Sequence, residues 1–110
     1  MQGSDFDLET IIVLLSPQKL KNPDADLRYI IPERIEEISE NTIQSNGYDY
    51  LKDNTLAIWL STNSYCKALP KIITLFEQET FLENDISKTA SIYASKQENA
   101  DLEQCKKIYP

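Results

Sequence analysis

The stretch that most constrains the fold is "LETIIVLLS", residues 8–16. It is rich in β-branched residues and apolar on both faces, which favours a strand buried on two sides. Pro17 follows directly, and proline cannot continue the hydrogen-bonded ladder of a central strand. The sequence therefore predicts an interior strand near the start of the chain.

A second constraint is "NGYDYLKDNTLAIWLST", residues 46–62, which has the pattern of two strands joined by a turn. Asp53 and Asn54 suit the two central positions of a tight hairpin loop. With that loop, Leu51 pairs with Leu56, and the aliphatic residues of the second strand face the core. The aromatic residues then point to the opposite face of the sheet. These residues are Tyr48, Tyr50 and Trp59.

Two helices are predicted, one on each side of the hairpin. In "PERIEEISENTIQSNG", Pro32 suits the first turn and Asn46-Gly47 is a helix stop, with a break expected near Ile31. "NSYCKALPKIITLFEQETFL" forms the second helix, capped by Asn63 or Ser64. Apolar residues recur at helical spacing in both. They are Ile31, Ile35, Ile38 and Thr42 in the first helix, and Leu69, Ile72, Ile73 and Phe76 in the second.

The last predicted strand is "KTASIYASK", in which small and apolar residues alternate with polar ones and a tyrosine. The resulting order is β-α-β-β-α-β. It predicts an α+β, ferredoxin-like sandwich with a four-stranded antiparallel sheet and two helices on one face. A chain of 110 residues is expected to form one domain, 1–110, with a core of about 8–96. Residues 97–110 form a C-terminal extension, in which "NADLEQCKKIYP" suggests a short helix.

The charge and the missing histidine exclude several classes of site. The chain has 18 acidic residues, 11 basic residues and no histidine, for a net charge of −7. Without histidine, the usual zinc sites and the Ser-His-Asp and Cys-His arrangements are absent. Asp24 or Asp26 could ligate a cation, but capping of a helix start is the simpler interpretation. Arg28, beside Tyr29, could bind an anion, but pairing with a nearby carboxylate is the simpler interpretation. We expect no enzymatic activity, no cofactor and no metal.

The same features bear on partners and location. Basic residues are scattered in pairs, so we expect no nucleic-acid partner. The longest apolar run, residues 11–15, is too short for a bilayer, and the N-terminus lacks a signal-peptide pattern, so we expect no membrane association. Cys66 and Cys105 belong to no CxxC pair, and two free thiols fit the cytoplasm. A disulfide between them remains an alternative, and Cys66 is expected to be a buried structural thiol.

A basic protein partner, in contrast, would be attracted to so acidic a surface. The carboxylate run from Glu33 to Glu40 is either the electrostatic footprint of such a partner or only a solvated helix face. Aromatic residues dominate binding hot spots, so the hairpin is a candidate anchor. The predicted partner-binding residues are Glu33, Glu36, Glu37, Glu40, Tyr48, Asp49, Tyr50 and Trp59.

The predicted aromatic face, made of Tyr48, Tyr50, Trp59 and Tyr93, has four interpretations, since such a patch is usually covered or used. Residues 97–110 fold back over it, two copies pair through it in a homodimer, a different protein binds it, or nucleic-acid bases stack on it. The acidic charge weighs against base stacking.

Three segments resemble small bacterial immunity proteins, the cognate inhibitors of polymorphic toxins and of contact-dependent growth inhibition systems. They are "NPDADLRYIIPERIEEI", "NGYDYL" and the strand "LAIWLST", within residues 8–96. The resemblance implies a cytoplasmic protein without enzymatic activity that binds one toxin domain, such as a basic nuclease, by occlusion. The alternative is a homodimeric ferredoxin-like domain that binds a small molecule or acts as a small enzyme.

Overall fold

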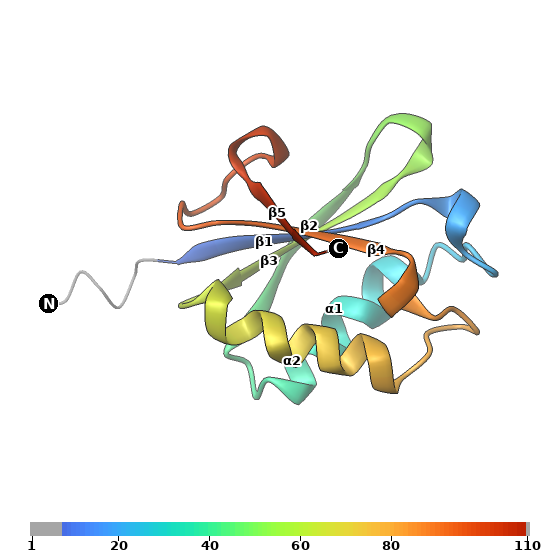
Figure 1. Cartoon of the computed structure of the whole chain (residues 1–110), viewed down its shortest axis with the longest axis horizontal. Helices are drawn as coiled ribbons and strands as arrows, with labels where there is room; N and C mark the ends of the chain where they lie inside the picture. The colour runs from blue at the N-terminus through green and yellow to red at the C-terminus, as the bar shows by residue number, and fades with distance from the viewer. Residues whose placement is uncertain (1–7, 110) are drawn as a thin grey trace, which may run out of the picture.

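The computed structural model describes residues 8–109 as an α+β fold with two α-helices and one five-stranded antiparallel sheet (Figure 1). The expectation about a signal peptide concerns residues 1–7, which lie outside this range. The sheet order is β2-β3-β1-β4-β5. The strands are β1 (Glu9–Leu15), β2 (Ile43–Tyr50), β3 (Leu56–Thr62), β4 (Ala90–Ser95) and β5 (Lys106–Tyr109), and the helices are α1 (Leu27–Ile38) and α2 (Tyr65–Gln78).

The central position predicted for the first strand is confirmed, since β1 lies between β3 and β4. The prediction of four strands is wrong. The segment expected to form a terminal helix makes one 3₁₀ turn at Leu102–Gln104 and then pairs with β4 as β5. This strand reads Lys-Lys-Ile-Tyr, in which isoleucine and tyrosine favour a strand and the two lysines suit a sheet edge.

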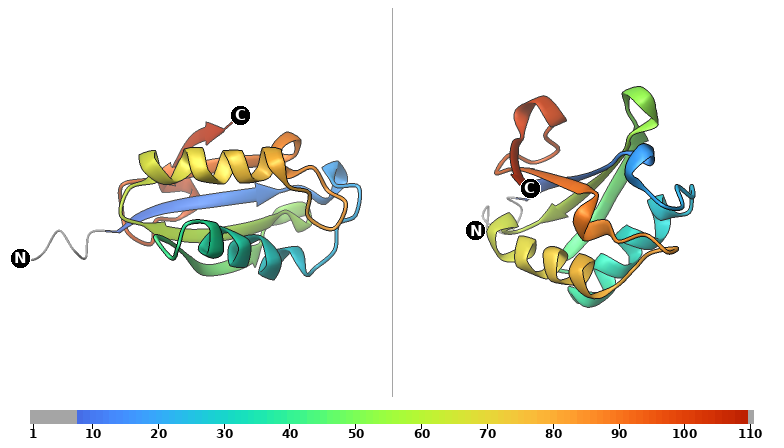
Figure 2. Two further views of the ribbon diagram at one scale, coloured as in Figure 1. Left: turned by 90° about the horizontal axis from the view of Figure 1, so that it is seen from below. Right: turned by 45° about the vertical axis from the view of Figure 1, so that its right-hand side comes forward.

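Both helices cover the same face of the sheet (Figure 2). Ile11, Val13 and Leu15 of β1 point to this face and are buried against the helices. The apolar stripe of α2 is confirmed: Leu69, Ile72 and Phe76 are buried and Ile73 is partly buried. Ser64 caps α2, because its side chain accepts from the N–H of Lys67, as predicted. No helix in the described range is long and apolar enough to cross a bilayer.

Helix α1 differs from its prediction at both ends. It begins at Leu27 and continues through Pro32, so the break expected near Ile31 does not occur. Both Ile31 and Pro32 are buried, and this packing outweighs the local preference against a helix before proline. Asp26 precedes the helix without a side-chain cap.

The helix ends at Ile38, well before Asn46-Gly47, because Glu40 and Asn41 have positive φ angles of 52° and 66°. Thr42 is therefore exposed and lies outside the helix instead of on its apolar stripe.

The face of the sheet opposite the helices is crossed by residues 96–105, which connect β4 to β5. Thr10 Oγ1 donates to the Gln97 carbonyl (2.8 Å) and accepts from the Ala100 N–H (3.1 Å). The indole Nε1 of Trp59 donates to the Ala100 carbonyl at 3.0 Å. Of the four interpretations of this face, cover by the C-terminal segment is therefore the one that holds at Trp59.

Strand β2 has a different register from the predicted one. The turn chemistry is as expected, since Asp53 and Asn54 both have positive φ angles, of 62° and 61°. However, Thr55 is bonded to two residues on the other side of the turn: its carbonyl accepts from the N–H of Leu51, and its N–H donates to the carbonyl of Lys52. This bulge sets two residues against one, so the side chains of residues 48–50 lie on the other face from the predicted one.

The observed register places two of the three hairpin aromatics on the face opposite to the predicted one. Tyr48 pairs with Ile58 and Tyr50 pairs with Leu56, so both tyrosines lie on the helix side of the sheet. Only Trp59 has the predicted orientation, opposite the helices, where it lies beside Ile12. A second irregularity, between Ser45 and Tyr48, includes Gly47 with a φ of 95°.

Candidate functional site

Four side chains from α1 and β2 form an aromatic cluster around one cation. Arg28 extends from α1, with its guanidinium carbon 4.5 Å from the ring centre of Tyr29 and 5.3 Å from that of Tyr48. Its Nη1 donates to the Tyr50 hydroxyl at 3.3 Å. The rings of Tyr29 and Tyr48 meet edge to face at 5.9 Å, and those of Tyr48 and Tyr50 at 6.1 Å. We call Arg28, Tyr29, Tyr48 and Tyr50 the tyrosine cluster.

The tyrosine cluster is the main concentration of exposed apolar surface in the described range. Tyr29, Tyr48 and Tyr50 are 50%, 42% and 44% exposed. Two other large apolar side chains there, Leu82 and Ile108, are less exposed, at 37% and 36%. Three exposed aromatic rings fixed by mutual contact offer contact area with little conformational entropy left to lose on binding.

A hollow of about 300 Å³ lies beside the cluster, between α1 and β2. Glu33 lines it with an exposed carboxylate, and Glu36 lines it while accepting from the N–H (2.9 Å) and the hydroxyl (3.1 Å) of Ser45. The hollow thus combines aromatic walls, one arginine and two carboxylates. Its lining residues are Arg28, Tyr29, Pro32, Glu33, Glu36, Ser45, Gly47 and Tyr48.

The electrostatics of the cluster depend on Arg28. Contact with the guanidinium lowers the pKa of Tyr29, while the neighbouring Tyr29 hydroxyl raises the pKa of Tyr48. Arg28 keeps its charge, because its contacts with the Tyr29 and Tyr50 hydroxyls raise its own pKa further. The Nε atom of Arg28 is buried and has no hydrogen-bond partner. The expected pairing of Arg28 with a carboxylate is wrong for the described residues, since aromatic rings surround its guanidinium instead.

The predicted partner-binding residues fall into separate groups. Glu33, Glu36 and Tyr48 line one hollow, and Tyr50 lies next to it, so half of the predicted set is brought together. Asp49, paired with Ala57, points to the face opposite the helices.

The remaining predicted residues lie elsewhere. Trp59 is also on the face opposite the helices, where it is partly buried beside Ala100. Glu37 pairs with Arg34, and Glu40 lies beyond the end of α1.

Sequence reasoning missed Arg28 and Tyr29 as members of the site. They meet Tyr48 and Tyr50, which lie about 20 residues further along the chain; Tyr50 is 22 positions after Arg28. The one available signal was the adjacent pair Arg28-Tyr29 in the first turn of α1, in which Arg28 is half-buried and Tyr29 is exposed. It becomes informative only when the register of β2 is known.

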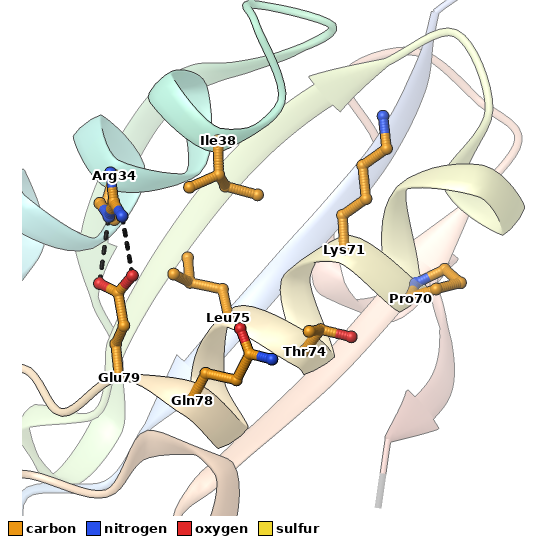
Figure 3. A pocket seen from close by; sticks show the side chains of 8 residues that line it. All are labelled: Arg34, Ile38, Pro70, Lys71, Thr74, Leu75, Gln78 and Glu79. Atoms are coloured by element: carbon orange, nitrogen blue, oxygen red, sulfur yellow. Dashed lines mark hydrogen bonds and ion pairs between the residues drawn. The ribbon is translucent and has the colours of Figure 1, made fainter.

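A larger hollow, of about 440 Å³, lies between α1 and α2 (Figure 3). At one end the Arg34 guanidinium faces the Glu79 carboxylate, with contacts of 3.1 Å from Nε to Oε1 and 2.8 Å from Nη2 to Oε2. Ile38 and Leu75 form apolar walls, and Lys71 extends over the far end (Figure 3). Arg34 and Glu79 neutralise each other, so the hollow offers a bound molecule few free charged groups.

The cysteines and acidic residues show no catalytic or metal arrangement in residues 8–109. Cys66 is exposed, so the prediction of a buried thiol is wrong, and Cys105 is partly buried. Both are free thiols, and burial raises the pKa of Cys105. No group of three or more Cys, Asp or Glu side chains in this range could hold a metal ion. Asp24 Oδ1 accepts from the N–H of Asp26 at 2.8 Å, in the turn that leads into α1.

Comparison of the chain with protein-family models, with curated proteins and with solved structures gave no match. The functional argument therefore depends on the geometry of the tyrosine cluster and on the charge of the chain.

Proposed function

We propose that the protein is an acidic inhibitor that binds and neutralises a basic toxin domain in the cytoplasm, as immunity proteins do. The observation that carries this proposal is the tyrosine cluster, in which three exposed rings and one arginine are held together at a single edge of the sheet. Tyrosine and arginine are enriched among the residues that dominate binding energy at protein interfaces. The net charge of −7 supports a basic partner.

We also propose that the first four strands and the two helices form a ferredoxin-like unit, to which β5 is an addition. The order β2-β3-β1-β4 within the sheet and the placement of both helices on one face support this assignment. In such a unit β2 is an edge strand, which leaves its outer side and the adjoining helix free for a partner.

The proposed mechanism is occlusion without catalysis. The rings of Tyr29, Tyr48 and Tyr50 would pack on the toxin surface and exclude water. The exposed Glu33 and Asp49 carboxylates would attract basic residues around its active site. Inhibition then requires only that the complex covers the active site, so no reactive group of this chain takes part.

The test uses the C-terminal domain of the polypeptide encoded immediately upstream of this chain, titrated into the pure protein by calorimetry. Tyr48→Ala should weaken binding by about 2 kcal/mol, which is roughly a thirtyfold rise in Kd. Glu33→Lys should slow association at low salt, and Glu77→Lys, the same charge reversal at an exposed position of α2, is the matched control. Absence of binding, or equal effects of Glu33→Lys and Glu77→Lys together with no effect of Tyr48→Ala, would contradict the proposal.

A further inference from the structure

The outer edge of β2 is only partly closed. β2 is the terminal strand of the sheet on one side, and seven of its eight residues are exposed. Edge strands present unpaired N–H and C=O groups, which proteins usually protect. The way in which this edge is protected changes along its length.

Side chains of α1 cap the first half of the edge. The N–H of Ile43 donates to Ser39 Oγ at 3.2 Å, and the same hydroxyl donates to the Ile43 carbonyl at 3.4 Å. The N–H of Ser45 donates to Glu36 Oε2 at 2.9 Å. These groups point away from β3 and are already satisfied. The irregularity that contains Gly47 then interrupts the strand.

The second half of the edge, Tyr48–Tyr50, has no such cap from α1. Successive residues of an antiparallel strand direct their backbone groups alternately inward and outward. The backbone N–H of Leu51 points inward and donates to the Thr55 carbonyl at 2.7 Å. By this alternation, the backbone groups of Tyr50 and Tyr48 point outward, and those of Asp49 point inward. The N–H of Tyr50 donates only to the neighbouring Asp49 Oδ1, at 2.8 Å. That carboxylate takes the place that the carbonyl of another strand would fill.

We propose that an extended segment of a basic protein partner adds to the sheet at Tyr48–Tyr50 as a further antiparallel or parallel strand. This inference rests on the proposed function and specifies how the partner docks. An added strand would lie about 4.8 Å outside β2. It would exchange backbone hydrogen bonds with Tyr48 and Tyr50, while the rings of these two residues contact its side chains on the helix side.

The charge around this edge favours a basic occupant. Glu33 and Glu36 lie on the helix side, and Asp49 and Asp53 lie on or next to the strand, against the two cations Arg28 and Lys52. The same balance disfavours a second copy of the chain, since each copy carries a net charge of −7.

The opposite edge of the sheet is a poorer acceptor. β5 has only four residues, and its first two are Lys106 and Lys107. Short, lysine-bearing edge strands are a common device against strand addition.

The first experiment uses a synthetic peptide as the probe: a blocked hexapeptide that alternates lysine and valine, followed by amide NMR shifts. The Tyr48 and Tyr50 amide signals should shift and saturate on titration, while the Ile43 and Ser45 signals stay fixed. The same peptide with alternate backbone nitrogens methylated, and one with glutamate in place of lysine, should leave Tyr48 and Tyr50 unshifted. A methylated peptide that binds equally well, or an unmodified peptide that leaves the Tyr48 amide unshifted, would overturn the proposal. So would shifts that follow protein concentration without peptide, because they would indicate self-association.

The second experiment separates the backbone from the ring. Tyr50→Pro removes the ring and the outward N–H, whereas Tyr50→Ala removes the ring and keeps the N–H. Proline should raise the Kd for the upstream-encoded domain at least about tenfold above that of the alanine variant, a difference of about 1.4 kcal/mol. Unchanged amide spectra elsewhere in the sheet would show that the proline variant is folded. If the Tyr50→Pro variant is not folded, the comparison of the methylated and unmodified peptides decides whether strand addition occurs.

The two proposals can fail separately. Equal binding of the Tyr50→Pro and Tyr50→Ala variants to the upstream-encoded domain would overturn strand addition and leave the inhibitor function standing. Binding of the lysine peptide at Tyr48–Tyr50 without binding of that domain would overturn the proposal of a toxin partner and would still support strand addition at this edge.

Discussion

Replacement of Thr10 by valine should release the segment that crosses the sheet. Thr10 is 2% exposed, and its hydroxyl is bonded to both the Gln97 carbonyl and the Ala100 N–H. Valine has nearly the same shape but cannot form either bond, and Ala100, which is 0% exposed, would keep a buried N–H without a partner. Two lost hydrogen bonds of about 1 kcal/mol each, with the desolvation of that N–H, give an expected destabilisation of about 2–3 kcal/mol.

Urea unfolding followed by far-ultraviolet circular dichroism measures this loss, and tryptophan emission localises it. The chain has one tryptophan, Trp59, whose indole is bonded to the Ala100 carbonyl, so release of the segment should shift its emission to the red before urea is added. Thr10→Ser is the control, because it keeps the hydroxyl and loses one methyl group, at a cost of about 1 kcal/mol. If the Thr10→Val variant were as stable as the Thr10→Ser variant and its tryptophan emission were unchanged, the Thr10 hydroxyl would not be what holds residues 96–105 on the sheet.

Two further predictions concern α1. Glu36→Ala should lower the free energy of unfolding by about 1–2 kcal/mol in thermal melts, since the Ser45 N–H loses its acceptor. An unchanged melt would show that this carboxylate only faces solvent. The guanidinium of Arg34 lowers the pKa of Glu79 from its ordinary 4.5, so the pair stabilises the fold above that value and loses its effect as pH falls through the lowered folded pKa. The stability gap between the wild type and Glu79→Gln should therefore close on acidification below pH 4.5, and a gap that widens would reverse the assignment.

Much of the fold can be predicted because its signals are local. The buried run of β1, the alternation in β3 and β4 and the Ser64 cap each lie within a few residues, and each element forms where expected. The end of α1 could not be placed, because it depends on the left-handed backbone at Glu40 and Asn41, residues that also fit a helix by pattern.

The candidate site was harder to predict, because it depends on the register of β2. A single unpaired residue at the Leu51–Lys52 bulge decides which face Tyr48 and Tyr50 occupy, and no local pattern distinguishes the bulged strand from the regular one. The carboxylate run could be recognised as acidic, and the pairing of Glu37 with Arg34 is local to the helix. The structural role of Glu36 could not be recognised, because it depends on where Ser45 of the next strand lies.

The two irregularities of β2 also affect how this strand can change over generations. Residues 46–47 of β2 lie against one residue of β3, and Leu51 and Lys52, directly after β2, lie against Thr55. Loss of one codon at either place would therefore remove an extra residue and leave the flanking pairs in register. The length of the strand is therefore free to vary at positions 46–47 and 51–52 without turning Tyr48 or Tyr50 to the other face. Asp49, between them, is regularly paired, so loss of its codon would place the side chains of Tyr48 and Tyr50 on opposite faces of the sheet. Deletions at these two places can thus shorten the strand while its last three residues, Tyr48–Tyr50, keep their orientation.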